Sequence, residues 1–197
     1  MSEQITLSLN ELRALLRKAF EGVFGHGRDW NAMADNVLWL ESHGYEGLAT
    51  FFAAYPKMEA SKKASLSVMP SGALTIDSHG TSLLEYVHLV GDILLSEVGG
   101  QGEARAHIQT TEKSNILNVL HPVFAKNGYV FDSSFDADGI KVIVTPGDCT
   151  PVNQEHHYLN VLEHGIALEK ADYERLCRYA DKVLVPATEQ SRRGAGE

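Results

Sequence analysis

The chain has 197 residues, of which 44% are hydrophobic and 22% are charged, an ordinary composition for a globular protein. Its 17 basic and 26 acidic side chains give a formal charge of −9, which argues against non-specific binding to nucleic acids and anionic membranes. Cys149 and Cys177 are too few for a disulfide framework, and no apolar stretch approaches the ~18 residues of a membrane span. Residues 1–13 also lack the basic and apolar regions of a secretion signal. We therefore expect a cytoplasmic protein without nucleic-acid or membrane partners.

The first part of the chain is predicted to be helical. A capping-box pattern at residues 8–11, followed by leucines at helical spacing, predicts a first helix that ends in the next glycine-rich stretch. A second helix is predicted from Trp30 to Ser42, and a short third helix from Glu46 to Ala54, which Pro56 would end.

The later part alternates between strand and helix patterns. Two β-hairpins are predicted, around residues 70–72 and around Asp138-Gly139. The remaining predicted helices are 82–97, 116–124 (with a kink or break at Pro122) and 172–181, and the remaining predicted strands are 104–111, 157–170 (with a bulge at Gly165) and 182–186.

These elements predict an α+β fold in one compact unit. A helical N-terminal subdomain, residues 1–58, precedes a mixed sheet with packed helices, residues 59–197. An α/β fold is the alternative, because the strand order that decides between parallel and antiparallel pairing does not follow from the sequence.

Two similar tetrapeptides, Glu41–Gly44 and Asp77–Gly80, each combine a carboxylate, a hydroxyl, an imidazole and a glycine. The first resembles a short stretch of the malate/L-lactate dehydrogenase-like oxidoreductases, in which a histidine of such a tetrapeptide serves the substrate. That resemblance implies a role for His43, although no G-x-G-x-x-G follows a predicted strand. The simpler interpretation is a helix end with Gly44 as its left-handed cap.

The second tetrapeptide lies between a predicted strand and a predicted helix. Polar residues at the carboxyl end of a strand are typical of ligand sites in α/β sheets, so His79 and Asp77 are our candidate catalytic acid–base pair. The alternative is a turn followed by an N-cap at Ser82.

No metal site is predicted. Residues 155–164 are rich in His and Glu, but on a strand His156 and His157 would point to opposite faces, and no H-E-x-x-H is present. Asp136 and Asp138 fit a hairpin turn better than a Ca²⁺ loop. Cys149 lacks an evident base, and we expect Cys177 to be a packing residue.

The C-terminal segment combines hydroxyls, paired guanidinium groups and a Gly-Ala-Gly run. Thr188, Ser191, Arg192 and Arg193 are therefore candidate binding residues for a phosphate or carboxylate. The alternative is a frayed chain end.

The same segment carries a family resemblance. Residues 185–196, with Ser8-Leu9-Asn10-Glu11, Trp39-Leu40, His43-Gly44 and residues 172–180, resemble a bacterial family known as domain of unknown function 3726. The resemblance implies a bacterial, cytoplasmic protein and implies no activity.

Two classes of function remain open from the sequence. The first is an accessory protein or a protein that binds a small anionic ligand, with a homo-oligomer as an option. The second is a small-molecule enzyme that uses His79 and Asp77 as its acid–base pair and Arg192 as an anion anchor. The sequence identifies no cofactor.

Overall fold

The computed structural model describes residues 3–24, 29–60, 67–71, 73–112, 115–148 and 155–183. The chain divides into two compact units. Unit 1 comprises Met1–Ala34 and Gly165–Glu197, and unit 2 comprises Asp35–His164. The predicted division into residues 1–58 and 59–197 within one compact unit stays a prediction.

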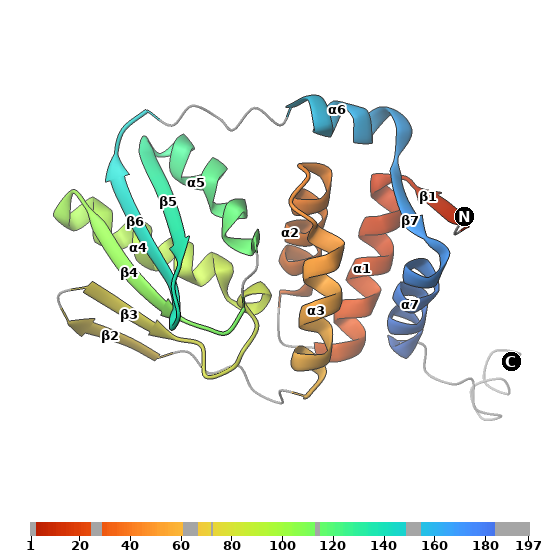
Figure 1. The fold of residues 1–197 in the computed structure, drawn as a ribbon, viewed down its shortest axis with the longest axis horizontal. Coiled ribbons are helices and arrows are strands. Elements are labelled where there is room, and N and C mark those ends of the chain that lie inside the picture. Colours follow the sequence, from red (N-terminus) through yellow and green to blue (C-terminus); the bar gives the residue numbers. More distant parts are fainter. Residues whose placement is uncertain are drawn as a thin grey trace, which may run out of the picture. The chain divides into compact units, whose positions relative to one another are not determined.

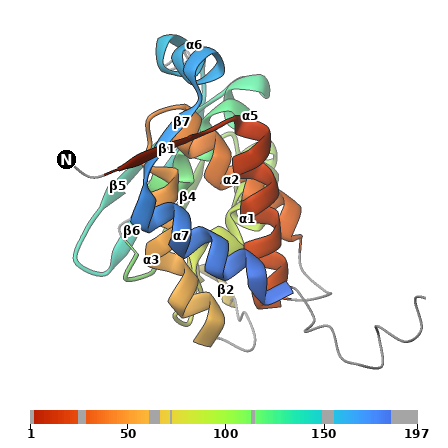
Figure 2. The same cartoon turned by 90° about the vertical axis from the view of Figure 1, so that its right-hand side faces the viewer.

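Unit 1 is a small helical layer joined to a two-stranded sheet (Figure 2). Strand β1 (Gln4–Leu7) pairs antiparallel with β7 (Ile166–Glu169), and helix α1 (Leu9–Phe24) packs against α7 (Lys170–Ala180). The predicted capping box begins α1. The Ser8 backbone N–H donates to Glu11 Oε2 at 2.8 Å, and the Glu11 N–H donates to Ser8 Oγ at 3.3 Å.

Helix α2 (Trp30–Ser42) has the predicted bounds and ends with Gly44 in the left-handed conformation, at φ 77°. Helix α3 (Gly47–Ala60) is longer than predicted, because it continues past Pro56 for another turn. That extra turn brings Met58 into the core, where it is almost fully buried. The apolar burial outweighs the backbone hydrogen bond that proline cannot make.

Gly47 explains how α3 begins against α2. A Cβ atom at this position would overlap the carbonyl oxygen of Val37 and lie 2.7 Å from the backbone nitrogen of Glu41. The two helix backbones therefore touch at Gly47, and a side chain there would push them apart.

The main sheet of unit 2 has the strand order β2-β3-β4-β6-β5 (Figure 1). Strands β3 and β4 pair in parallel, and all other neighbours pair antiparallel. The strands are β2 (Ser67–Ser71), β3 (Ala73–Asp77), β4 (Ala104–Gln109), β5 (Tyr129–Phe135) and β6 (Gly139–Pro146). The sheet is therefore mixed, and both predicted hairpins and the predicted α+β class are confirmed.

Strands β4 and β6 bury alternate side chains. Helix α4 (Val87–Gln101) packs on β4 and β6, and α5 (His121–Lys126) packs on β5. The predicted helix 82–97 is in fact interrupted, since a 3-10 turn, η1 (Leu83–Glu85), ends at Tyr86 before α4 begins. The predicted break near Pro122 is confirmed, because the 3-10 helix η2 (Asn115–Leu120) gives way to α5 there.

The predicted strand over 157–170 is wrong. Residues Glu155–His164 form helix α6, and only Ile166–Glu169 form a strand. The alternation that suggested a strand carries no buried face, since Leu159 and Leu162 are each more than half exposed. Gly165 is the junction rather than a bulge. It has φ 78°, and a Cβ there would lie 2.7 Å from the Leu7 carbonyl oxygen.

The end of the predicted strand 182–186 also differs. Asp181–Val183 form a 3-10 turn, η3, and residues 184–186 lie outside the described part of the chain. No helix among the described residues is long and apolar enough to cross a membrane.

Candidate functional site

The loop after β3 is a tight turn that the sequence Asp77–Thr81 specifies. The Thr81 N–H donates to the Ser78 carbonyl oxygen at 2.7 Å, and the two residues between them, His79 and Gly80, have φ of 45° and 78°. Two successive positive φ values define a type I′ turn. The His79 N–H donates to Asp77 Oδ1 at 2.8 Å, which adds a local Asx turn.

The predicted N-cap alternative is also correct. Ser82 Oγ accepts a hydrogen bond from the Leu84 N–H at 3.3 Å and so caps η1. The turn and the cap together account for the backbone conformation. They do not account for the positions of the Asp77 and His79 side chains.

These two side chains meet. His79 Nδ1 lies 3.2 Å from Asp77 Oδ2, and the imidazole is about half exposed. A carboxylate beside Nδ1 favours a proton on that nitrogen and makes Nε2 the basic one. The two predicted residues are therefore in contact, and a catalytic role for them stays a prediction.

Beside this pair is a cavity of about 530 Å³, here called the Asp77 cavity. It opens at the carboxyl ends of β3 and β4 and at the turn between β5 and β6. Its lining residues are Asp77, Ser78, Gly80, Gln109, Thr110, Thr111, Glu112, Phe135, Asp136, Ala137, Asp138 and Gly139. The register explains this grouping, because Asp77 pairs with Gln109 and Gln109 pairs with Gly139. Two steps across the sheet span roughly 10 Å.

Asp136 is held on one wall of the Asp77 cavity by several donors. Lys141 Nζ lies 3.0 Å from Asp136 Oδ2, and the Asp138 N–H donates to Asp136 Oδ1 at 2.9 Å. His107 Nε2 lies 3.6 Å from Asp136 Oδ1. Hydrogen bonds from Lys141 and from the Asp138 backbone lower the pKa of Asp136 to about 2, so this carboxylate is ionised at neutral pH.

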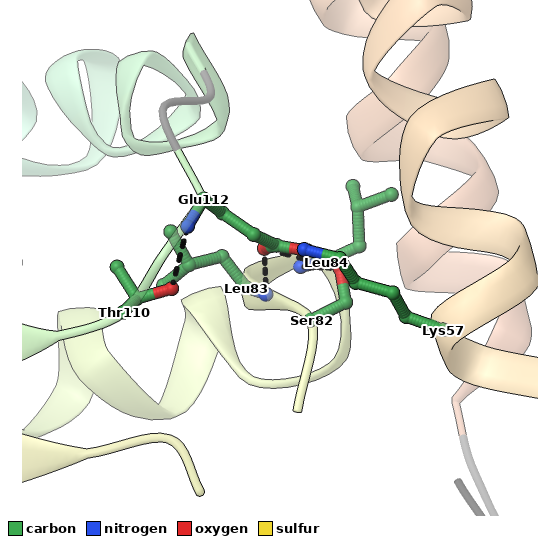
Figure 3. Close-up of polar contacts among 6 residues, drawn as sticks. All are labelled: Lys57, Ser82, Leu83, Leu84, Thr110 and Glu112. Carbon is green, nitrogen blue, oxygen red and sulfur yellow. Dashed lines mark hydrogen bonds and ion pairs between the residues drawn. The ribbon is translucent and has the colours of Figure 1, made fainter. Parts of the chain in front are cut away.

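Glu112 also lines the Asp77 cavity, and its side chain is 11% exposed. Its polar contacts join the loop after β4 to the start of η1 (Figure 3). Its Oε2 accepts hydrogen bonds from the Leu83 N–H at 2.7 Å and from Ser82 Oγ at 3.3 Å, at the N-terminus of η1. Its Oε1 lies 3.6 Å from Lys57 Nζ on α3. The Glu112 N–H in turn donates to Thr110 Oγ1 at 3.1 Å, which orients the loop after β4.

Glu112 and Thr111 also line a second cavity, of about 340 Å³, whose opposite wall is α3. Its other lining residues are Glu46, Ala49, Thr50, Ala53, Ala54, Lys57 and Asn115. The Glu112 carboxylate therefore separates two cavities and fixes the position of the loop between them.

Tyr86 lies behind the Asp77 cavity. The residue is 6% exposed. Burial raises the pKa of Tyr86, a hydrogen bond with the Ser78 side chain lowers it, and the nearby carboxylates Glu112 and Asp77 raise it further, so that the pKa lies above its ordinary value. The phenol is therefore neutral and lies close to three residues that line the cavity.

The other predicted histidine, His43, is at a helix end, as the simpler interpretation held. Its Nδ1 lies 2.8 Å from the Trp39 carbonyl oxygen, and its ring stacks between Trp39 at 4.2 Å and Tyr158 at 5.1 Å. Neither His43 nor His79 is a lining residue of the Asp77 cavity, but Ser78 and Gly80, the neighbours of His79 in the chain, are. A role of His43 toward a substrate stays a prediction.

The histidines of residues 155–164 lie on helix α6, so the argument from opposite strand faces was wrong. His157 Nε2 lies 3.3 Å from the Glu41 carbonyl oxygen instead of facing other ligand-type side chains. Among the described residues, no group of three or more His, Cys, Asp or Glu side chains is placed to hold a metal ion. Cys177 is a partly exposed free thiol on α7.

The predicted anion-binding residues Thr188, Ser191, Arg192 and Arg193 lie outside the described part of the chain, as does Cys149. The sequence reasoning missed Glu112, Asp136 and Tyr86 as parts of a site. Glu112 had a detectable signal, because it follows two threonines at the carboxyl end of a predicted strand. Tyr86 had none, since it lies within an apolar helix pattern.

Comparison with known proteins gives a family match over the first part of the chain and a shared fold. Residues 7–81 match the model of a family described as protein of unknown function (DUF3726), which confirms the predicted resemblance over that range. No curated protein matches the sequence.

Several solved structures share the fold. A dehydrogenase from Sinorhizobium meliloti has a TM-score of 0.73 at 9% identity, covering 90% of this chain and 100% of that one. A putative malate/lactate dehydrogenase from E. coli has a TM-score of 0.72 at 9% identity, covering 96% and 98%. Malate dehydrogenase from Entamoeba histolytica has a TM-score of 0.53 at 11% identity, covering 67% of this chain and 40% of that one. At such identities the likeness establishes the fold alone.

Proposed function

We propose that this protein binds a small molecule in the Asp77 cavity and that His79, oriented by Asp77, transfers a proton to or from it. The observation that carries the proposal is the 3.2 Å contact between His79 Nδ1 and Asp77 Oδ2, because Asp77 lines the cavity, as do Ser78 and Gly80, the neighbours of His79 in the chain. A carboxylate-oriented imidazole beside a cavity is the arrangement that general acid–base catalysis uses.

Two further features support the proposal. The cavity lies at the carboxyl ends of the parallel strands β3 and β4, where ligands bind in sheets of this kind. The fold is also shared with proteins described as dehydrogenases, which act on small molecules.

The test compares wild type with His79→Gln and Asp77→Asn variants. Each is incubated in D₂O with pools of small metabolites, and NMR follows both turnover and the exchange of carbon-bound hydrogen for deuterium. His79→Gln should lower the rate by about 10²-fold or more, as removal of a general acid–base does. Asp77→Asn should retain a partial rate, because it disturbs only the tautomer and orientation of the imidazole.

His164→Gln is the matched control, since His164 is an exposed histidine of α6 outside the Asp77 cavity. It should match wild type. A substrate that is turned over equally by wild type and His79→Gln would refute the proposal.

The second candidate function is binding of a small anion, or an accessory role that depends on it, through Thr188, Ser191, Arg192 and Arg193. Paired arginines beside a glycine run support it. Inorganic phosphate should then raise the melting temperature of wild type, and Arg192→Ala should abolish the rise. An equal rise in both proteins would contradict an anion site at these residues.

The net charge of −9 supports the further expectation that nucleic acids and membranes are not partners. The presence of only two cysteines supports the expectation that the protein is cytoplasmic. A bacterial origin and a homo-oligomeric state are also part of this proposal. Light scattering on the eluted protein measures the oligomeric state directly.

A further inference from the structure

We infer that the ligand of the Asp77 cavity is a neutral, polyhydroxylated molecule such as a sugar or a sugar alcohol. This inference rests on the proposed function only for the location of the site. It adds the chemical class of the ligand, which the His79–Asp77 pair alone does not define.

The charges around the cavity argue against an anion. Four carboxylates line it, from Asp77, Glu112, Asp136 and Asp138, and none of the described lining residues is Lys or Arg. An anionic ligand would meet carboxylate oxygens without a facing cation, which is unfavourable at close range.

The four carboxylates of the lining do not require a cationic ligand either. Three of the four carboxylates already have a basic partner outside the lining. Asp77 contacts His79, Asp136 contacts Lys141, and Glu112 lies near Lys57. The lining therefore offers many hydrogen-bond acceptors, and those of Asp136 and Glu112 each have a lysine nearby. Hydroxyl groups suit such a surface, because each one donates to a carboxylate oxygen and still accepts a bond.

The uncharged polar residues of the lining supply the complementary donors. Gln109 carries an amide, and Thr110 and Thr111 carry hydroxyls, all at or just after the end of β4. A molecule with several hydroxyls can both donate to the carboxylates and accept from these groups.

Phe135 adds an apolar surface to this polar wall. It ends β5, lines the cavity and is 47% exposed, which is unusual for so large an apolar ring. The ring of a sugar has a face of C–H groups that packs on an aromatic side chain while its hydroxyls point to the polar wall.

The experiment uses three probes with the same ring and different charge: glucose, glucuronate and glucosamine. Sorbitol and myo-inositol serve as further neutral probes. Saturation-transfer NMR and calorimetry on the full chain measure binding to each. We expect at least one neutral probe to bind about tenfold or more tightly than glucuronate and more tightly than glucosamine.

Phe135→Ala should weaken binding of the neutral probe by about three- to tenfold, and Phe135→Trp should retain it, because the larger ring preserves the packing surface. Leu89→Ala is the matched control, since Leu89 is similarly exposed, at 48%, but lies on α4 and not in the lining. It should bind like wild type.

The outcomes separate the inference from the proposed function. The inference is overturned if no neutral probe binds, if a charged probe binds more tightly than all neutral ones, or if Phe135→Ala and Leu89→Ala behave alike. Turnover of a charged molecule that depends on His79 would overturn the inference while upholding the proposed function. Binding of neutral probes that depends on Phe135, with turnover unaffected by His79→Gln, would uphold the inference and overturn the proposed function.

Discussion

Removal of the Glu112 carboxylate should destabilise unit 2 more than its partly exposed position suggests. Glu112 Oε2 is the acceptor for the Leu83 N–H at 2.7 Å, and Leu83 is fully buried. In Glu112→Ala, this N–H and the Ser82 hydroxyl both lose their acceptor.

The expected magnitude follows from the individual contacts. A hydrogen bond to a charged acceptor contributes about 1.5–3 kcal/mol, and a buried donor left without a partner costs about 1–3 kcal/mol. The Lys57 contact at 3.6 Å adds less than about 1 kcal/mol, because the Lys57 side chain is 45% exposed. We therefore expect Glu112→Ala to lower the free energy of unfolding by about 2–4 kcal/mol and Glu112→Gln, which keeps one oxygen acceptor, by about half as much.

Urea unfolding followed by circular dichroism measures these differences. Lys57→Met is the control, because it removes the ion pair and leaves the hydrogen bonds to η1 intact. In thermal unfolding, Glu112→Ala should melt about 5–15 °C below wild type. The reasoning is refuted if Glu112→Ala costs less than about 1 kcal/mol, or if Lys57→Met costs as much as Glu112→Ala.

Three further predictions concern the fold and its titrating groups. Gly47→Ala should lower the free energy of unfolding by at least about 2 kcal/mol, because its Cβ atom would overlap the backbone of α2. Gly99→Ala, in open space on α4, should raise the free energy of unfolding by about 0.5–1 kcal/mol. Similar urea midpoints for the two variants would contradict this prediction. Burial lowers the pKa of His121 in the folded state, so the unfolded chain takes up the proton first, and the free energy of unfolding should fall as pH drops from about 7 to 5. In urea unfolding, His121→Gln should make the free energy of unfolding less dependent on pH. An unchanged pH dependence would rule out His121 as the cause. Lys141→Met should raise the pKa of Asp136 from about 2 toward its ordinary value, because it removes the ammonium group beside the carboxylate. Carbon-13 NMR of the Asp136 carboxyl group measures this pKa. An unchanged pKa would show that the hydrogen bond from the Asp138 backbone is enough to keep it low.

Features that depend on nearby residues followed from the sequence alone. The capping box at Ser8, the bounds of α2 and both hairpins were predicted, because each is specified by side chains within a few positions of the backbone that they affect. The contact between His79 and Asp77 belongs to this group as well, since both lie in one tight turn.

Local patterns failed where burial decides the structure. Residues 155–164 alternate like a strand but form a helix, because the exposed Leu159 and Leu162 do not report a buried face. Pro56 did not end α3, because the turn after it buries Met58.

The Asp77 cavity itself was decided only by the tertiary structure. Parallel pairing of β3 with β4 and antiparallel pairing of β4 with β6 bring Asp77, Gln109 and Gly139 into one row across the sheet, although 62 positions separate the first from the last. The contact between Glu112 and the N-terminus of η1 joins segments 29 residues apart in the same way. The sequence determined the turn that holds the His79–Asp77 pair, because that turn is local. The strand order determined what faces the pair, because pairing between distant strands depends on how the whole core packs.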